Sequence, residues 1–401
     1  MKVLVLNCGS SSIKYQFIDT DQQKALAKGM VDRIGMTGAV LTHQRYDGDK
    51  IKIAGEILDH SMAIEYVLGV MMSKNHGVID SKKDIEAVGH RVVHGGETFS
   101  DSVLITDEVI NVIQENIELA PLHNPPNIKG IQACMKLLPD APQVSVFDTA
   151  FHVKMPPKSY LYGIPYDLYK KHKIRRYGFH GTSHLYVSNK AADILGKKLE
   201  DLRIITAHLG NGCSMAAVKY GASVDTTMGF TPLEGLLMGT RSGDIDPSLI
   251  LYIMGKEGLT SHEASTLLNK HSGLIGISGE SSDMREILAA HKDGHKRATY
   301  AFEIFCYRIK KYFGAYTAAM GGVDALVFTG GIGENAVEVR SEVCKDLDFF
   351  GISLDEIKNK DNEEVISKNN SKVKVLRVPT NEELVIAMDT SRIAEEIIQS
   401  A

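Results

Sequence analysis

The sequence contains few cysteines and no pairing pattern among them. Its five cysteines are odd in number, scattered, and never arranged as C-x-x-C: Cys8, Cys134, Cys213, Cys306 and Cys344. This distribution argues against a disulfide scaffold and predicts free thiols in a reducing compartment. The first apolar run is too short for a secretory signal, and no window approaches eighteen consecutive apolar residues. We therefore expect a cytoplasmic protein that does not span a membrane.

An excess of basic residues is also absent. The formal net charge of -5 argues against nucleic acid as a main partner, because binding to a phosphate backbone requires a basic face. A local exception is the run Lys170–Arg176, which reads KKHKIRR. Such a run could bind an anion, but it more often forms a solvated surface, and we expect the solvated surface here.

Several common nucleotide and metal motifs are missing. No G-x-x-x-x-G-K-[ST] occurs, which excludes a P-loop, and no G-x-G-x-x-G follows the first strand, which weakens a Rossmann site. His180 and His184 are four residues apart, as zinc ligands on one helix face would be, but the glutamate of H-E-x-x-H is missing. A hydrogen-bonding or structural role for His184 is therefore favoured over zinc.

The opening stretch Met1–Phe17 reads as a strand, a Gly-Ser turn and a second strand. The turn offers backbone N–H groups, three serine hydroxyls and Lys14, a combination that suits the phosphates of a nucleotide. The pattern returns at Arg203–Val218, where aligning Asn7 with His208 also aligns the two turn glycines. Two copies predict two similar lobes that bind one nucleotide. Chance similarity between two apolar hairpins remains the alternative.

The first half of the chain predicts an α/β lobe. A length of 401 residues, with 43% hydrophobic and 24% charged residues, predicts a globular protein of two domains. Strands at 25–34 and 39–46 complete a four-stranded meander before the first helix. The remaining elements are predicted at 59–72 (helix), 85–93 (strand), 107–119 and 127–138 (helices) and 143–147 (strand). In such a lobe, ligand groups collect at the carboxyl ends of the strands.

The second half repeats this plan with longer insertions. A stretch without periodicity, Asp225–Pro247, is a candidate functional loop because long unpatterned loops in compact proteins are usually functional. Helices are predicted at 180–195, 247–254, 261–269, 283–291, 298–320 and 381–398. The strand 325–328 leads into a glycine-rich loop and then a helix, a good place for phosphates or ribose, and a last strand covers 372–378. We expect an N-terminal lobe over 1–150, to which the C-terminal helix 384–401 returns, and a nucleotide-binding lobe over 151–383.

A group of arginines, histidines and carboxylates lies among the glycine turns. Phosphoryl transfer needs cations aimed at three equatorial oxygens, a divalent metal and an in-line acceptor. Arg91 and Arg241 can supply planar cations, and both lie in Gly-rich breaks after apolar runs. For each arginine, a surface salt bridge remains the alternative. The complete group is Arg91, His123, Asp148, His180, Arg241 and Glu382.

Eight motifs, in order, resemble those of the acetokinase family over essentially the whole chain. They are NCGSSSIK (7–14), HRVVHGG (90–96), FDTAFH (147–152), YGFHGTSH (177–184), HLGNG (208–212), GFTPLEGLLMGTRSGDIDP (229–247), FTGGIGEN (328–335) and TNEE (380–383). The one departure is Cys8, where many relatives have alanine. Both residues are small, so this difference puts little in doubt.

This resemblance implies the fold of the sugar kinase, actin and chaperone ATPase superfamily. Two duplicated lobes, each with a ribonuclease H-like β-sheet and helices, would surround a nucleotide cleft. The implied reaction is reversible phosphoryl transfer from ATP to acetate, which gives ADP and acetyl phosphate, in a homodimer. Mg²⁺ would be the cofactor, with Mn²⁺ as a substitute. Neither nucleic acid nor a membrane is implied as a partner.

The same resemblance implies roles for individual residues. The metal would be held by Asn7 and Glu382, and catalysis would use Arg91, Asp148, His180 and Arg241. The nucleotide would contact Lys14, His208, Leu209, Gly210, Asn211, Gly212, Asp283, Met284, Arg285, Gly331, Ile332, Gly333, Glu334 and Asn335. The acyl substrate would contact Arg91, Val93, Leu122, His123, Phe179 and Pro232. A core role is the alternative for the apolar members of the acyl set.

Two physical arguments qualify these implications. A carboxylate substrate, with a pKa near that of Glu (about 4.3), is already ionised at neutral pH and needs no base. We therefore expect Asp148 to organise Mg²⁺, water or an arginine rather than to accept a proton. One methylene is worth only about 1 to 3 kcal/mol in a small apolar pocket, so propionate or butyrate kinase activity is the nearest alternative. An ATP-driven binding module of the actin or chaperone type is a more distant one.

Overall fold

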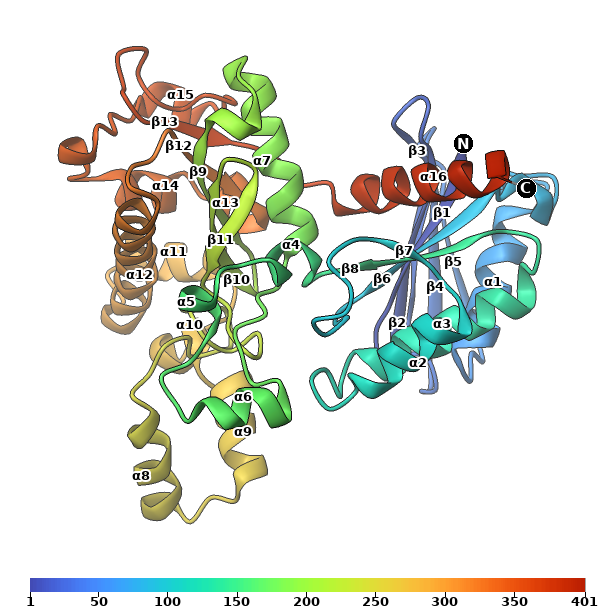
Figure 1. Cartoon of the computed structure of the whole chain (residues 1–401), viewed down its shortest axis with the longest axis horizontal. Helices are drawn as coiled ribbons and strands as arrows, with labels where there is room; N and C mark the ends of the chain where they lie inside the picture. The colour runs from blue at the N-terminus through green and yellow to red at the C-terminus, as the bar shows by residue number, and fades with distance from the viewer. Residues whose placement is uncertain (401) are drawn as a thin grey trace. The chain divides into compact units, whose positions relative to one another are not determined.

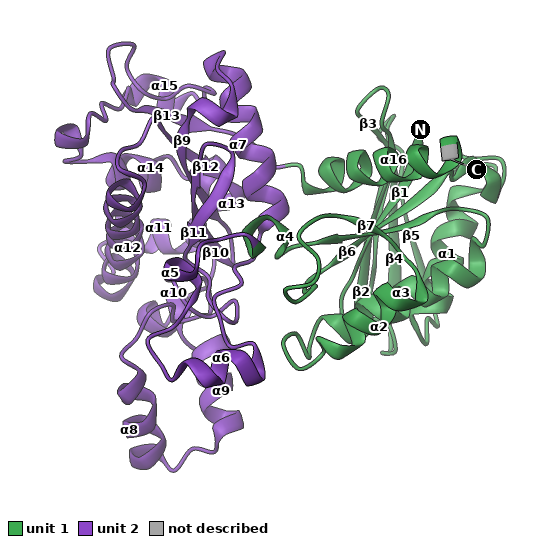
Figure 2. Ribbon diagram, in the orientation of Figure 1, with its two compact units in different colours: residues 1–153, 381–401 green, residues 154–380 purple. Residues whose placement is uncertain are grey.

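The computed structural model describes residues 1–400, which fall into two compact units (Figures 1 and 2). Unit 1 contains residues 1–153 together with the C-terminal segment from Asn381, and unit 2 contains residues 154–380. Each unit has one mixed β-sheet packed with helices. The chain is therefore an α/β protein with two lobes, as the sequence predicts.

Unit 1 is built on an eight-stranded sheet whose order is β5-β4-β3-β2-β1-β6-β8-β7. The first five strands form an antiparallel meander, β6 and β8 run parallel to β1, and β7 is antiparallel to β8. The bounds are β1 Lys2–Cys8, β2 Ser12–Asp19, β3 Lys24–Asp32, β4 Ala39–Arg45, β5 Lys50–Gly55, β6 Ala87–Val92, β7 Val103–Leu104 and β8 Gln143–Phe147. The predicted meander of four strands is wrong by one strand, because the structure adds β5. This strand lies at the sheet edge and has no buried residue, so its sequence lacks the apolar pattern by which a strand is recognised.

Both faces of the central strand β1 are buried. Leu4 and Leu6 pack in a cluster with residues of α1, whereas Val3 and Val5 pack in another cluster with Ile386 of α16. Burial on two faces explains why β1 is a continuous apolar run rather than an alternating one. The helices of unit 1 are α1 His60–Met71, α2 Asp107–Glu115, α3 Asn124–Leu137, α4 Ala150–Val153 and α16 Glu382–Ser400. Helix α3 begins before the predicted residue 127 because two prolines are accommodated in its first turn.

Unit 2 repeats the central part of this sheet. Its order β11-β10-β9-β12-β13 corresponds to β3-β2-β1-β6-β8, and the same pairs are antiparallel and parallel in both sheets. The bounds are β9 Arg203–Leu209, β10 Cys213–Lys219, β11 Ala222–Thr226, β12 Ala325–Thr329 and β13 Lys374–Arg377. The two predicted hairpins are therefore equivalent elements of duplicated sheets.

The helices of unit 2 are mostly those predicted. They are α5 Pro157–Tyr160, α6 Tyr166–His172, α7 Gly181–Leu195, α8 Pro247–Glu257, α9 Ser261–Lys270, α10 Gly273–Ser278, α11 Met284–Lys292, α12 Lys296–Met320, α13 Gly330–Asn335, α14 Val337–Cys344 and α15 Glu356–Lys360. The short helices α5, α6, α10 and α15 were not predicted. The glycine-rich segment after β12, predicted as a loop, is the short helix α13, which Gly330 enters with φ +75°.

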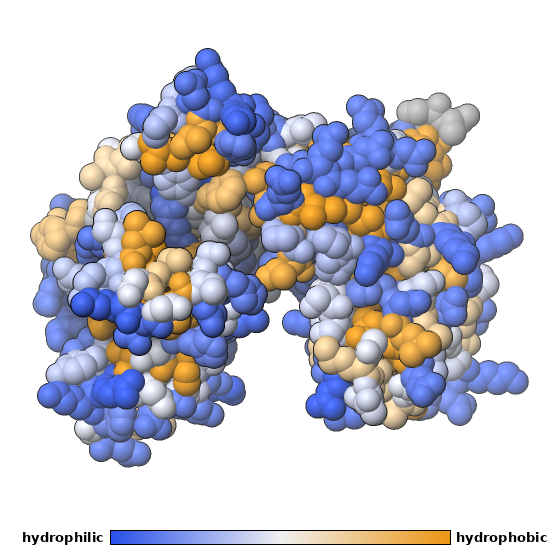
Figure 3. All heavy atoms as spheres, turned by 90° about the horizontal axis from the view of Figure 1, so that it is seen from below, coloured by the Kyte–Doolittle hydropathy of each residue, from blue (hydrophilic) through white to orange (hydrophobic). Residues whose placement is uncertain are grey.

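The surface in Figure 3 is mainly hydrophilic, with separate small hydrophobic patches. Throughout residues 1–400, every helix is too short or too polar to extend across a bilayer.

Candidate active site

The first hairpin turn is held by two neighbouring helices. The Gly9 amide donates to the Ser12 carbonyl at 2.8 Å, which closes the turn. The Asn127 side chain of α3 donates to the Cys8 carbonyl, and the His60 ring of α1 bonds to the Gly9 carbonyl, both at 2.8 Å. Helix α3 also packs closely against the turn: a Cβ added to Gly130 of α3 would lie only 2.3 Å from the Cys8 sulfur. The turn is therefore a rigid element that fixes its polar side chains.

Four predicted site residues of unit 1 line one small cavity. Asn7 and Lys14 are direct partners across the hairpin, and both line this cavity with Arg91 and Glu382. Its volume of about 20 Å³ is close to that needed by one water molecule. The structure thus brings together the residues predicted to contact the metal and the anionic ligands in unit 1.

Asp148 holds the guanidinium of Arg91 from one side. The Nε and Nη2 groups of Arg91 donate to the two carboxylate oxygens of Asp148 at 2.9 and 2.5 Å. Burial lowers the pKa of Arg91, but the carboxylates of Asp148, Glu382 and Glu383 together raise it above its ordinary value. Nη1 has no hydrogen-bond partner among the described residues, so one edge of the guanidinium can bind a second carboxylate. This ion pair is consistent with the expectation that Asp148 orients an arginine rather than accepting a proton.

Glu382 is a carboxylate without a partner. Within the described chain its side chain forms neither a hydrogen bond nor an ion pair, and burial raises its pKa to about 7. Arg91 and Lys14 lower this pKa, whereas Asp148 and Glu383 raise it further. The oxygens of Glu382 and of the Asn7 amide fit Mg²⁺, which is commonly bound by one or two carboxylates plus phosphates and water. Residues 1–400 contain no group of three or more His, Cys, Asp or Glu that could hold a metal by themselves.

Three histidines of unit 2 lie together, and two of them, His180 and His184, share one hydroxyl group. His180 precedes α7 in the left-handed conformation, with φ 57°, and its Nδ1 lies 2.9 Å from the Ser214 hydroxyl. The same hydroxyl is 2.7 Å from Nε2 of His184, whose Nδ1 contacts Thr206. His184 thus has the hydrogen-bonding role favoured from the sequence. The His180 and His208 rings stack, with centroids 4.3 Å apart.

Arg241 and His180 converge on Gly212. A Cβ placed on Gly212 would lie 3.5 Å from Nη1 of Arg241 and 3.6 Å from Nε2 of His180. Arg241 forms no ion pair with any described residue, and burial lowers its pKa. Arg241 is thus a partly buried cation without a counter-ion, and it lies beside a histidine and a glycine, which has no side chain to fill the space. This arrangement provides a site for an anionic group.

The loop that carries Arg241 is fixed by half-buried polar side chains. Arg176 donates to the carbonyls of Thr226 and Thr227 at 3.0 Å and forms an ion pair with Glu234 at 2.6 Å. Farther along the loop, Asp244 accepts from the Gly235 amide at 2.8 Å and from the Tyr312 hydroxyl at 2.5 Å. These contacts replace the ladder of hydrogen bonds that regular structure would provide.

The expectation that the whole run Lys170–Arg176 is a solvated surface is wrong at its end. Arg175 is only 3% exposed and stacks on Tyr160, and Arg176 anchors the Arg241 loop. The earlier lysines are exposed, as predicted. Charge composition alone does not distinguish a solvated arginine from one that binds backbone carbonyls.

Most of the predicted nucleotide contacts of unit 2 line one pocket of about 760 Å³. The pocket extends over the second hairpin turn, the start of α11 and helix α13. The predicted residues that line it are Gly210, Asn211, Asp283, Met284, Arg285, Gly331, Ile332 and Asn335. Sequence reasoning missed Lys292 and Glu338, an ion pair at the pocket wall with N–O distance 2.6 Å. The volume of this pocket is within the range of sites that bind small molecules.

The other predicted nucleotide contacts lie outside the lining of this pocket: His208, Leu209, Gly212, Gly333 and Glu334. The Glu334 carboxylate accepts from the backbone amides of Gly330 and Thr380 at 3.0 and 3.1 Å. It therefore joins the start of α13 to the segment that follows β13. A nucleotide contact by Glu334 stays a prediction.

The predicted acyl-pocket residues differ in exposure. Val93 in unit 1 and Phe179 in unit 2 are buried, whereas Leu122 is 72% exposed. His123 is exposed just before α3, and Pro232 lies half-buried in the Arg241 loop. Their contact with an acyl group stays a prediction.

Gly212 offers a selective test of the anion site. The distances from a Cβ to Arg241 and His180 are ordinary van der Waals contacts, and Gly212 does not need a positive φ. We therefore expect Gly212→Ala to fold with an unchanged midpoint of thermal unfolding but to lose about 10²-fold in kcat, because the methyl group occupies the space for the anion. Gly163→Ala is the matched control, since Gly163 is exposed, lies outside the predicted site and would have open space for a Cβ. Equal kinetics for the two variants would remove Gly212 from the site.

Comparisons with known proteins agree with the resemblance predicted from the motifs. The sequence model of the acetokinase family matches residues 2–388. The acetate kinase of Thermoanaerobacter pseudethanolicus is 58% identical over 398 residues, which cover 98% of this chain and 99% of that protein. The crystal structure of Porphyromonas gingivalis acetate kinase has a TM-score of 0.95 and 53% identity, and it covers 98% of this chain and 99% of that one. A propionate kinase from Francisella tularensis has a TM-score of 0.91 and 44% identity, with the same coverage.

Proposed function

This chain belongs to the acetokinase family and is an enzyme, a kinase of that family, and from that premise we propose how its residues transfer a phosphoryl group from ATP to acetate. Unit 1 contributes Arg91 and Glu382 to this reaction, and unit 2 contributes Arg241 and His180. The products are acetyl phosphate and ADP, and the reaction is reversible. The single observation that carries this proposal is the pair of guanidinium groups, each with N–H groups left free by its protein partners.

Arg91 orients the acceptor acid. Its Nε and Nη2 are fixed by Asp148, so the remaining edge of the guanidinium donates to the carboxylate of acetate in a defined plane. The substrate is ionised at neutral pH, so one of its oxygens attacks the γ-phosphorus directly. No proton has to be removed, and Asp148 keeps its charge throughout.

Arg241 and His180 stabilise the charge of the phosphoryl group in transit. The transition state spreads negative charge over three equatorial oxygens, and cations already in position lower its energy without reorganisation. Arg241 lacks an internal counter-ion, so its attraction is available to the substrate. His180 is kept in place by Ser214 and by the stacked ring of His208.

Asn7 and Glu382 would hold Mg²⁺, with Mn²⁺ as a substitute. When bound, the metal neutralises the phosphate oxygens of the nucleotide. Lys14, the partner of Asn7 across the hairpin, adds a fixed cation beside this position. The pocket of unit 2 would hold the remainder of ATP.

A hydroxamate assay tests the reaction and its substrate. We expect the purified protein to form acetyl hydroxamate from ATP, Mg²⁺, acetate and hydroxylamine, and to use propionate with a kcat/KM about 10-fold to 200-fold lower. Butyrate should be poorer still. A higher kcat/KM for propionate or butyrate would assign the chain to that acid instead; a propionate kinase is among its structural relatives, at 44% identity. ATP hydrolysis without any acyl phosphate would favour the ATP-driven binding module.

The raised pKa of Glu382 predicts a pH dependence of metal binding. Because the metal requires the carboxylate, we expect the Mg²⁺ affinity to fall about tenfold per pH unit below about pH 7 and to be constant above it. Glu382→Gln should bind Mg²⁺ weakly at every pH. Isothermal titration calorimetry between pH 5.5 and 8.5 measures both, and a profile that is flat in the wild type would contradict the assignment.

The same pKa has a consequence for stability without metal. The folded pKa is above the unfolded value of about 4.5, so the penalty for ionising Glu382 is absent below about pH 4.5 and complete above about pH 7. Glu382→Gln should therefore stabilise the metal-free protein at pH 8 by about 1 to 3 kcal/mol. Denaturant unfolding in EDTA measures this difference.

We also propose that the enzyme is a homodimer. Helix α8 has no buried residue, and Leu249, Leu251 and Tyr252 on it are 44, 69 and 63% exposed. Apolar side chains exposed together typically mark an interface. We expect Leu251→Glu combined with Tyr252→Glu to convert a dimer into a monomer in light scattering, whereas Ile357→Glu on α15, 74% exposed in the wild type, leaves the dimer intact. A wild-type monomer would refute the proposal.

A further inference from the structure

One face of the antiparallel half of the first sheet carries four lysines. Lys14 of β2, Lys28 of β3, and Lys50 and Lys52 of β5 line a single pocket of about 430 Å³. The strand register produces this arrangement: residues 14, 30, 42 and 52 form one row across the four strands, and residues 16, 28, 44 and 50 form the next row. Since side chains alternate between faces with period two, both rows point to the same side.

The opposite face of these strands is the buried one. Tyr15, Gly29 and His43 form the row between the two lysine-bearing rows, and Tyr15 and His43 bond to each other at 2.6 Å. Helix α16 packs mainly on β1, β6 and β8 of the sheet. The four lysines therefore lie on the face of β2 to β5 that is opposite to the hydrophobic core.

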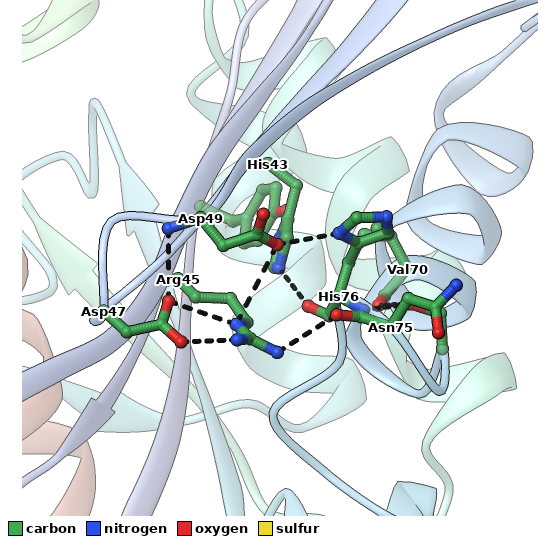
Figure 4. Close-up of polar contacts among 9 residues, drawn as sticks. His43, Arg45, Asp47, Asp49, Val70, Asn75 and His76 are labelled. Atoms are coloured by element: carbon green, nitrogen blue, oxygen red, sulfur yellow. Dashed lines mark hydrogen bonds and ion pairs between the residues drawn. The ribbon is translucent and has the colours of Figure 1, made fainter.

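The lysines lack acidic partners. None of the four forms an ion pair or a side-chain hydrogen bond with a described residue. The acids nearest in the sequence to Lys50 and Lys52, on the turn between β4 and β5, are occupied elsewhere (Figure 4). Arg45 pairs with Asp47, and Asp49 contacts Nδ1 of His76 at 2.7 Å. Glu383 is the one acidic residue of the described chain that lines the pocket.

Edge protection does not explain the whole pattern. Lysines on an edge strand prevent sheets from pairing edge to edge, which accounts for Lys50 and Lys52 on β5. Lys14 and Lys28 are on interior strands, where that purpose does not apply. Like charges on neighbouring strands repel, so a concave site with four cations and one acid favours an anion that neutralises them.

We propose that this pocket binds a short inorganic polyphosphate. Its charge is opposite to that of the lysines, and a chain of phosphates presents several acceptors to cations on neighbouring strands. Gln16, Thr42 and Gln44 supply further polar groups, whereas the one aromatic lining residue, Tyr15, is only 2% exposed and offers no open ring face for a base. The pocket shares Lys14, Tyr15 and Glu383 with the small cavity beside Glu382, so an occupant would act next to the catalytic residues.

Inorganic triphosphate is the probe. Titration calorimetry would use the full-length enzyme in Mg²⁺-free buffer with saturating ADP, which blocks the nucleotide pocket. We expect one triphosphate to bind the wild type, and Lys50→Gln with Lys52→Gln to weaken its binding about tenfold, as two lost ion pairs predict. The matched control is Lys197→Gln with Lys198→Gln, two exposed lysines of unit 2, which should bind as the wild type does.

A second measurement does not depend on a variant. Acetylation of wild-type lysines by a limiting amine reagent, followed by peptide mass spectrometry, should be slowed by triphosphate at Lys28, Lys50 and Lys52 but not at Lys197 and Lys198. Absence of binding in the ADP-saturated wild type would overturn the proposal, as would equal weakening in both double variants or uniform protection of all lysines. Neither Lys50 nor Lys52 belongs to the proposed catalytic machinery, so the hydroxamate assay without triphosphate should give wild-type rates for both double variants. A failure of the proposed kinase reaction would leave these binding results unchanged.

Discussion

Arg241→Ala is expected to lower kcat about 10³-fold while the KM for acetate changes less than about threefold. The reason is the electrostatic position of Arg241, whose guanidinium has no counter-ion among the described residues and faces the space above Gly212. Its interaction strengthens as charge moves onto the equatorial oxygens, so its loss raises the transition state more than the ground state. Steady-state kinetics with saturating MgATP and varied acetate measures the effect.

Two further variants make the Arg241 result specific. Arg241→Lys retains the charge but loses the planar group, so its kcat should lie between those of the wild type and the alanine variant. Arg392→Ala removes an arginine whose ion pairs on α16 are exposed, and its kcat should be unchanged. A kcat for Arg241→Ala within threefold of the wild type would remove this residue from the mechanism.

Asp148→Asn is expected to reduce kcat/KM for acetate about 10²-fold without removing a limb of the pH-rate profile. The buried carboxylate makes two charge-assisted hydrogen bonds to Arg91, and each is worth about 1.5 to 3 kcal/mol. An amide can accept only one of them, so the guanidinium loses its fixed orientation toward acetate. The measurement is kcat/KM from pH 5.5 to 9 in both proteins.

A double-mutant cycle with Arg91→Ala provides the control. If Asp148 acts by positioning Arg91, the Asp148→Asn change should have little further effect once Arg91 is absent. Loss of one limb of the profile in Asp148→Asn would instead show that Asp148 transfers a proton. Additive effects of the two changes would show that the residues act independently.

The sequence predicted the parts of the fold that depend on local pattern. Both hairpins were recognised because a Gly turn separates two apolar runs, and α1 was recognised from its 3.6-residue apolar stripe and Asp59 cap. Strand β5 was missed because its inward-facing Ile51 and Ile53 are only half-buried at a sheet edge. Helix α13 was missed because its three glycines predict a loop, although the Glu334 carboxylate at the Gly330 amide supports a helical turn.

The candidate site was predicted through residue types and motifs, not through contacts. The pairing of Arg91 with Asp148 joins residues 57 positions apart, and no local pattern specifies it. The anchors Arg176, Asp244 and Tyr312 were missed because their partners are distant in sequence or are backbone carbonyls. The left-handed conformation of His180 was likewise not visible from the spacing of His180 and His184, which suggested one helix face.

The central claim is that the phosphoryl group passes directly from ATP to the acid, without a covalent enzyme intermediate. Its most direct test is the stereochemistry of transfer from ATP made chiral at the γ-phosphorus with oxygen isotopes, in a single turnover with acetate. One in-line displacement predicts inverted configuration in acetyl phosphate. Retained configuration would require two displacements, with a phosphorylated side chain between them, and would contradict the roles given to Arg91 and Arg241.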